Sequence, residues 1–253
     1  MGTELALEME AVSRHFGSTV AVDALSLRLP VGAFLGLLGR NGAGKTTTIQ
    51  MATGLLRPTA GRIRVLGLDV AAQPVAVKRR IGVMPQDDSL LDFLTGDQYL
   101  DFLGQIHGLS RSETAHRRGE LFETLDLAPP AGTLVREYSY GMKKKLGLAA
   151  ALLHAPHLLF LDEPFEGIDP VTARTLRELL AGLPARGITL VMTSHVLEIV
   201  EKLCDPIAIL DRGRLVAEGS QRDLASCRGG EGGLESLFLE LVGGARKGEL
   251  SWL

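Results

Sequence analysis

A loop with almost no side chains and a single amine is the segment of this sequence with the clearest chemistry. Residues 39–48 read GRNGAGKTTT, in which Gly39, Gly44, Lys45 and Thr46 match the spacing of a phosphate-binding loop. The glycines let backbone N–H groups curl around an anion. The lysine adds a movable positive charge for the terminal phosphates, and the threonine hydroxyl suits Mg²⁺. This spacing favours a nucleotide phosphate site over an ordinary glycine-rich turn.

A pair of carboxylates supplies the second half of such a site. Asp162 and Glu163 follow the apolar run LLFL, where a buried strand is expected to end. Two carboxylates at a strand end can simply be solvated. Downstream of a phosphate loop, however, Asp162 is suited to hold Mg²⁺ through water, and Glu163 to direct the water that attacks the γ-phosphate.

Two kinds of strand and one helical region must position these residues. Period-two alternation in 4–10, 24–30 and 61–67 predicts antiparallel strands with one solvated face. Continuous apolar runs favour parallel strands covered by helices on both faces; they are 34–39, 157–162 and 188–194. A hairpin is expected over 207–219, turning at 211–213.

Between about residues 92 and 153 the apolar period becomes helical, which predicts a helical subdomain inserted between two parallel strands. The segment 228–233, RGGEGG, predicts a flexible break before a short amphipathic piece. The fold class that follows is α/β, with a mostly parallel sheet, an antiparallel β subdomain and the helical insertion.

The composition limits the function classes. The 253 residues carry a net charge of −3, which gives no electrostatic footprint for nucleic acid. The most apolar stretch, 146–161, is interrupted by His154, Pro156 and His157 and falls short of the roughly 20 apolar residues of a membrane span. We therefore expect any membrane-spanning part to belong to another chain.

Six motifs in order resemble the nucleotide-binding subunit of ATP-binding cassette transporters over nearly the full length. They are GRNGAGKTT, GVMPQ, YSYGM, LLFLDEP, EGIDP and TSH. The resemblance implies a P-loop ATPase domain over 1–225, with its helical subdomain at about 92–153. A flexible break and a C-terminal tail would follow at 226–253.

The resemblance also implies roles. Phe16 matches the aromatic that stacks on adenine, with a core position as the alternative. Gln86 matches the residue that senses Mg²⁺ and water and links the site to the membrane partner. His195 matches the histidine that contacts the γ-phosphate. Asp169 would touch the opposite subunit, and before Pro170 it is also a good helix N-cap.

The expected ATP-binding residues are Phe16, Gly39, Asn41, Gly42, Ala43, Gly44, Lys45, Thr46, Thr47, Ser139, Gly141 and Asp169. The expected Mg²⁺ ligands are Thr46, Gln86 and Asp162, and the expected catalytic residues are Glu163, His195 and Gln86.

The stretch YSYGM departs from the family's common Leu-Ser-Gly-Gly-Gln. Ser139 and Gly141 match, whereas Tyr138, Tyr140 and Met142 do not. In the family this stretch caps a helix and grips the γ-phosphate of ATP bound to the other subunit. If residue 140 lies in the first helical turn, its φ is negative and a tyrosine is tolerated. If the position needs a positive φ, the tyrosine is strained.

The function that the resemblance implies is an ATP-binding and ATP-hydrolysing subunit that works with Mg²⁺, powers a separate membrane permease and pairs head to tail with a second ATP-binding subunit. Finer likeness favours an exporter of the ABC-2 type, acting at the cytoplasmic face of the membrane. A non-transport cassette ATPase and a regulatory nucleotide-binding module are the alternatives.

The permease would dock near 87–96, where Leu90, Leu91, Phe93 and Leu94 gather, at least two of them expected to be core. Lys143, Lys144 and Lys145 are interpreted as a solvated helix face.

Overall fold

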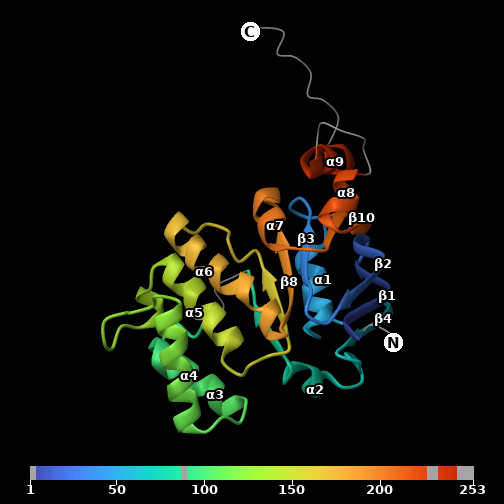
Figure 1. Cartoon of the computed structure of the whole chain (residues 1–253). Helices are drawn as coiled ribbons and strands as arrows, with labels where there is room; N and C mark the ends of the chain where they lie inside the picture. Colours follow the sequence, from blue (N-terminus) through green and yellow to red (C-terminus); the bar gives the residue numbers. More distant parts are fainter. Residues whose placement is uncertain (1–3, 87–89, 227–232, 244–253) are drawn as a thin grey trace, which may run out of the picture.

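Two β-sheets form the frame of the molecule (Figure 1). The structure, a computed structural model, describes residues 4–86, 90–226 and 233–243. A six-stranded sheet has the strand order β10-β9-β3-β8-β7-β6, and a four-stranded sheet has the order β2-β1-β4-β5. The mixed α/β class is therefore confirmed.

The six-stranded sheet is parallel except for its edge strand β10. Its members are β3 (Phe34–Leu38), β6 (Ile81–Met84), β7 (Leu158–Asp162), β8 (Thr189–Ser194), β9 (Ile207–Asp211) and β10 (Arg214–Gly219). Every residue of β3, β7 and β8 is buried, as the continuous apolar runs predict for strands covered on both faces. The predicted hairpin is confirmed in β9 and β10, joined through Arg212 and Gly213, both with positive φ.

The four-stranded sheet is antiparallel and alternates as predicted. Its members are β1 (Leu5–Phe16), β2 (Thr19–Pro30), β4 (Ala60–Val65) and β5 (Leu68–Asp69). In β1 the side chains of Leu7 and Met9 are buried, whereas Glu8 between them forms ion pairs with Arg28 and Arg64 at 3.5 and 3.2 Å. One face of this sheet thus belongs to the core and the other carries charges.

The helical subdomain is inserted between β6 and β7, as predicted, and forms the green-to-yellow lobe in Figure 1. It contains α3 (Gly96–Ile106), α4 (Arg111–Thr124), the short η1 (Val135–Glu137) and α5 (Tyr140–Leu152). A polar side chain caps each long helix: Thr95, Ser110 and Ser139 accept from backbone N–H groups of the first turn.

The remaining helices surround the sheets. They are α1 (Lys45–Ala52), α2 (Pro74–Lys78), α6 (Pro170–Gly182), the short η2 (Pro184–Arg186), α7 (Leu197–Leu203), α8 (Gln221–Ser226) and α9 (Gly233–Val242). The amphipathic C-terminal piece is confirmed as α9, which buries Leu234 and Val242 in the core and exposes Leu239. The expected break at 228–233 lies almost wholly outside the described residues. In the described part of the chain, no helix combines the length and apolarity that a bilayer crossing requires.

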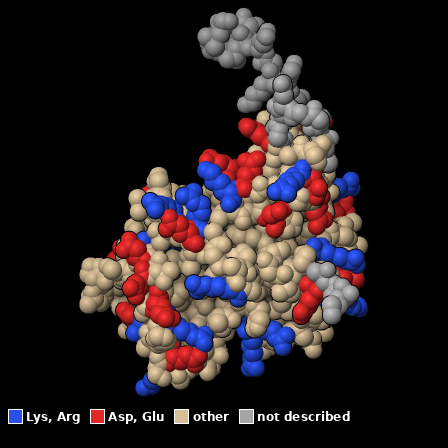
Figure 2. All heavy atoms as spheres, in the orientation of Figure 1, with Lys and Arg blue, Asp and Glu red and all other residues tan. Residues whose placement is uncertain are grey.

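The interpretation of Lys143–Lys145 as a solvated face is wrong for two of the three lysines. Lys144 is 1% exposed and Lys145 is 7% exposed. Consecutive helix residues point about 100° apart, so three in a row cannot share one face. The Lys144 and Lys145 ammonium groups turn inward and donate to the carbonyl oxygens of Gln86 and Asp126, at 2.8 and 2.9 Å. Across the face seen in Figure 2, basic and acidic side chains are interspersed.

Candidate nucleotide site

The phosphate loop lies between β3 and α1, at the carboxyl edge of the parallel sheet. Lys45, the first residue of α1, is only 6% exposed. Its Nζ donates to the carbonyl oxygens of Gly39 and Arg40, at 2.8 and 3.3 Å. The loop thus folds around its own ammonium group and aims the positive end of α1 toward the same pocket.

Two glycines of the loop allow this close approach. Gly44 has a φ of 100°, and a Cβ on it would lie 2.5 Å from the Ala21 carbonyl oxygen. A Cβ on Gly39 would lie 2.6 Å from the Leu210 carbonyl oxygen. Side chains are therefore excluded here by backbone from elsewhere in the fold, as well as by the phosphates that such a loop binds.

Asp162 ends β7 and is 3% exposed. Its Oδ1 accepts a hydrogen bond from the Thr193 hydroxyl on β8 at 2.6 Å. Burial raises the pKa of Asp162, and the Thr193 and Thr46 hydroxyls oppose that rise. The predicted Mg²⁺ ligands Thr46 and Asp162 are therefore near enough for the Thr46 hydroxyl to lower the pKa of Asp162.

Glu163 contacts two other predicted site residues, Lys45 and His195. It is 6% exposed, and its Oε1 lies 3.2 Å from Lys45 Nζ in an ion pair that lacks hydrogen-bond geometry. Its Oε2 lies 3.1 Å from Nδ1 of His195. Its backbone has a φ of 48°, an uncommon conformation outside glycine, and its N–H donates to the Thr193 hydroxyl at 2.9 Å. The strained turn directs the carboxylate back toward the phosphate loop.

Gln86 follows β6 and lines the same pocket as Glu163 and the loop residues, among them Asn41, Gly42, Ala43, Gly44, Thr46 and Thr47. Its Nε2 donates to Glu166 Oε2 at 2.8 Å. The amide is therefore held by the segment that follows Asp162 and Glu163. The structure thus brings seven loop residues, Lys45 among them, together with Asp162, Glu163, Gln86 and His195.

Phe16 is 47% exposed, so the alternative of a core position is wrong. The Arg14 guanidinium lies over its ring, 4.5 Å from the centroid. Phe16 does not line the pocket, but Thr19 and Val20, which follow it in the β1–β2 hairpin, do. Stacking on adenine stays a prediction for this residue.

Ser139, Gly141 and Asp169 form a second group, and none of them lines the pocket at the phosphate loop. Ser139 caps α5, and Asp169 caps α6 as predicted, its Oδ1 accepting from the N–H groups of Val171 and Thr172. Hydrogen bonds from Thr172, the side chain first, lower the pKa of Asp169. A Cβ on Gly141 would lie 3.4 Å from Asp169 Oδ2, so the two helix N-termini are neighbours.

Tyr140 is the first residue of α5 and does not have a positive φ. Of the two alternatives that the sequence left open, the unstrained helical turn is therefore the correct one. Tyr140 in place of the common glycine therefore introduces no positive-φ strain in the backbone.

Thr193 and Glu166 are site residues that sequence reasoning missed. Thr193 is fully buried and serves both Asp162 and Glu163. The signal available was a hydroxyl inside the apolar run before Ser194 and His195. Glu166 had no comparable signal, because its contact with Gln86 spans 80 residues of sequence.

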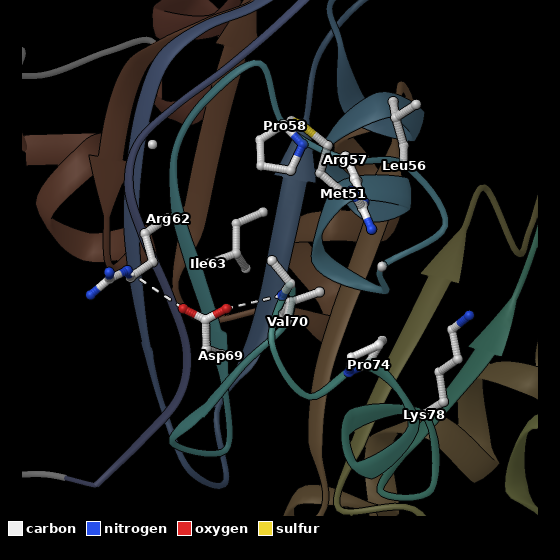
Figure 3. A pocket seen from close by; sticks show the side chains of 13 residues that line it. Met51, Leu56, Arg57, Pro58, Arg62, Ile63, Asp69, Val70, Pro74 and Lys78 are labelled. Atoms are coloured by element: carbon white, nitrogen blue, oxygen red, sulfur yellow. Dashed lines mark hydrogen bonds and ion pairs between the residues drawn. The ribbon is translucent and has the colours of Figure 1, made fainter.

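A separate pocket lies at the C-terminal end of α1, where residues of β4 and β5 also line it (Figure 3). Its wall includes Met51, Ile63 and Val70, with Arg57 and Lys78 at its rim. Asp69 is engaged locally, pairing with Arg62 at 3.5 Å and accepting from the Ala71 N–H. None of these residues was predicted to act in the nucleotide site.

The comparison with known proteins agrees with this geometry. The family model described as ABC transporter matches residues 22–166. The daunorubicin resistance ATP-binding protein DrrA3 of Streptomyces coeruleorubidus is 40% identical over 228 residues, which are 90% of this chain and 72% of that protein. Nod factor export ATP-binding protein I of Rhizobium etli is 39% identical over 219 residues, which are 87% of this chain and 69% of that protein.

A solved structure, that of the ATP binding subunit of an ABC transporter, is 30% identical, with a TM-score of 0.86. The match covers 93% of this chain and 99% of that one. The ordered motifs, the residues gathered at the phosphate loop and these likenesses agree, and the chain therefore belongs to the ABC transporter family as an ATP-binding and ATP-hydrolysing subunit.

Proposed function

We propose that this chain is the motor subunit of an exporter. It binds ATP with Mg²⁺, closes head to tail on a second ATP-binding subunit and drives a separate permease at the cytoplasmic face of the membrane. The observation that carries the proposal is the meeting of Lys45, Glu163 and His195 beside the phosphate loop. The relatives named for drug resistance and for Nod factor export support the direction of transport.

Hydrolysis follows from an exchange of partners at Lys45. The Lys45 ammonium group is paired with the Glu163 carboxylate at 3.2 Å. The terminal phosphates of ATP offer Lys45 a stronger anionic partner, which releases the Glu163 carboxylate. Glu163 then accepts a proton from the attacking water, while His195, hydrogen-bonded to Glu163, contacts the γ-phosphate.

The residues around Asp162 fit Mg²⁺, because this ion prefers hard oxygen ligands. Thr46 and Gln86 line the same pocket, and the Thr46 hydroxyl acts on the pKa of the Asp162 carboxyl. We propose that Thr46 and Gln86 hold the ion, with Asp162 acting through water. When bound, Mg²⁺ supplies positive charge that neutralises the phosphate oxygens. Phe16 would stack on adenine through the ring face opposite Arg14.

The second group of residues supports a head-to-tail dimer. Ser139, Gly141 and Asp169 lie together but not in the pocket of their own phosphate loop. The N-terminus of α5 presents backbone N–H groups suited to a phosphate. A second subunit turned head to tail would bring this helix end to the γ-phosphate, so each site would be completed by two chains.

An apolar groove at the junction of lobe and core supports docking of a permease helix. It is lined by Leu55 after α1, Val75 on α2, and Leu103 and Ile106 on α3. Leu55, Val75 and Ile106 are 62–65% exposed, which is unusual for large apolar side chains in one groove. An amphipathic helix in such a groove would move with both the lobe and the core.

The segment 87–96 offers less than expected for this docking. Residues 87–89 lie outside the described part of the chain. Leu90 and Leu94 pack against the core, as expected for at least two of the four apolar residues, whereas Leu91 and Phe93 are exposed. We therefore propose the groove as the main dock, with Leu91 and Phe93 as additional contacts.

The Glu163→Gln variant tests the proposed chemistry. Glutamine keeps the shape but removes the base, so we expect ATP turnover to fall about 100-fold or more. ATP binding should persist, and light scattering after gel filtration with Mg²⁺ and ATP should detect a trapped dimer. Lys45→Ala is the contrasting variant, because it should weaken ATP binding itself. Near-parent turnover in Glu163→Gln would overturn the assignment.

A further inference from the structure

Lys144 is a buried cation in the first turns of α5. It is 1% exposed, although lysine is among the residues least often buried. It follows Tyr140 by four positions, so both side chains lie on the same face of the helix. An ammonium group is costly to bury unless polar partners replace its water, so the contacts of this lysine indicate what it holds in place.

The ammonium group of Lys144 donates to the backbone carbonyl oxygen of Gln86 at 2.8 Å. The side chain of the same glutamine is held from the other direction, because its Nε2 donates to Glu166 Oε2 at 2.8 Å. Glu166 in turn donates its N–H to the Glu163 carbonyl oxygen at 3.2 Å. Gln86 is thus held between the helical lobe and the segment that carries the catalytic carboxylate.

The Lys144 ammonium group also lies over the Tyr140 ring, with Nζ 5.2 Å from the ring centroid. The ring also packs on Gly167, where a Cβ would lie 3.0 Å from the Tyr140 Cε1. A glycine at position 140, as in the family's common motif, would offer neither contact. The tyrosine and the buried lysine therefore form one arrangement.

We propose that Lys144, backed by the Tyr140 ring, is a positioning residue that fixes Gln86 for ATP hydrolysis in its own subunit. This inference rests on the role proposed for Gln86. The lysine fixes the backbone from which the Gln86 amide reaches into the pocket. The unusual tyrosine of the stretch YSYGM thereby affects the ATP site of its own chain as well as the one across the proposed dimer.

Steady-state ATP hydrolysis by the purified full chain tests the proposal. Lys144→Met keeps the length of the side chain but removes the charge. We expect kcat to fall about tenfold, the size typical of one lost charge-assisted hydrogen bond, with KM for ATP within about twofold of the parent. Lys144→Arg should restore most of kcat. Tyr140→Leu should lower kcat by about two- to fivefold, and the double variant should be no slower than Lys144→Met alone.

Lys145→Met is the matched control. Lys145 is a second buried lysine of α5, 7% exposed, that also donates to a carbonyl oxygen, but that oxygen belongs to Asp126. Its loss should lower the melting temperature without a selective fall in kcat. If the melting curve shows that Lys144→Met does not fold, Tyr140→Leu takes its place as the test. A lower kcat at unchanged KM in Tyr140→Leu would support the proposal, and the kinetics of the parent would overturn it.

Variants made in a Gln86→Ala background test separately whether Gln86 acts in hydrolysis and whether Lys144 acts through Gln86. Parent turnover in Gln86→Ala alone would show that the proposed role of Gln86 is wrong. If Gln86→Ala is slow and the added Lys144→Met changes nothing further, the positioning role is supported. If Lys144→Met slows the Gln86→Ala protein by the same factor as the parent, Lys144 does not act through Gln86 and the inference fails.

Discussion

At the scale of single residues, one hydroxyl organises both carboxylates of the site. The Thr193 hydroxyl donates to Asp162 Oδ1 at 2.6 Å and accepts from the Glu163 N–H at 2.9 Å. The second bond holds the backbone of Glu163 at its uncommon φ of 48°. Thr193 therefore sets the direction of the proposed base as well as the charge distribution on the proposed Mg²⁺ ligand.

Thr193→Val keeps the shape of this side chain but removes both hydrogen bonds. We expect ATP turnover to fall by about tenfold or more and the free energy of unfolding to fall by about 1–3 kcal/mol, because Asp162 and the Glu163 N–H lose a buried partner. Enzyme assays and urea denaturation measure the two effects. Thr193→Ser, which retains the hydroxyl, should recover most of both, and a valine variant with parent activity would contradict this role.

At the scale of elements, two stacked histidines join the helical lobe to the parallel sheet. The rings of His107, which caps α3, and His154, which follows α5, have centroids 3.8 Å apart. His154 Nε2 lies 2.9 Å from the Ile81 carbonyl oxygen on β6. Burial, together with the charges of His107 and Arg117, lowers the pKa of His154 from 6.5 to about 4. The pair also lines the proposed permease groove.

This arrangement predicts a pH dependence of stability. Because the folded-state pKa lies below the unfolded value, the neutral ring contributes fully above about pH 6.5 and that contribution is lost as the pH falls toward 4. After allowance for solvent screening, we expect a loss of about 1 kcal/mol between pH 7.5 and 5.5. Urea denaturation at the two pH values measures it.

His154→Gln should remove most of this pH dependence, because glutamine keeps an amide donor for the Ile81 carbonyl and does not titrate. His116→Gln is the control, since the His116 side chain is 74% exposed and its loss should leave the dependence unchanged. An unchanged pH dependence in His154→Gln would assign the effect to other groups.

At the scale of the whole molecule, the proposed ATP site would combine two surfaces that lie apart within one chain. Ser139 and Gly141 of the stretch YSYGM lie at the N-terminus of α5, and the phosphate loop lies at the N-terminus of α1 (Figure 1). Ser139→Arg should therefore abolish turnover by blocking closure while leaving ATP binding to the isolated chain intact, as measured by nucleotide titration. Ser112→Arg, on the outer helix α4, is the control with expected parent activity. Normal turnover in Ser139→Arg would argue against the shared site.

The coupling to a membrane is tested at the same scale. Val75→Asp or Ile106→Asp places a charge in the groove beside α2 and α3, and we expect either to abolish recovery of the chain with its co-expressed permease in the membrane fraction. ATP binding should not change. Val31→Asp introduces the same charge at an exposed valine in the β2–β3 turn and should be harmless. Equal recovery of all three variants would exclude the groove as the dock.

The phosphate loop and the elements with a clear apolar pattern could be predicted from the residues alone. The loop is ten contiguous residues, and its spacing is a local property that needs no other part of the chain. The alternating and continuous apolar runs likewise report how many faces of a strand are buried, so both sheets and the helical insertion were predictable. The N-cap at Asp169 was predictable for the same reason, since a cap acts within one helical turn.

Which of these residues lie close together depends on how the elements pack in three dimensions. Lys45, Glu163 and His195 come from distant parts of the chain and are joined because parallel strands end at one edge of the sheet. The inward direction of Lys144 likewise depends on where α5 packs, since a polar run has no local signal for a buried carbonyl 58 residues away. Contacts across the sheet and between lobe and core depend on packing, which residue types and short-range spacing do not specify.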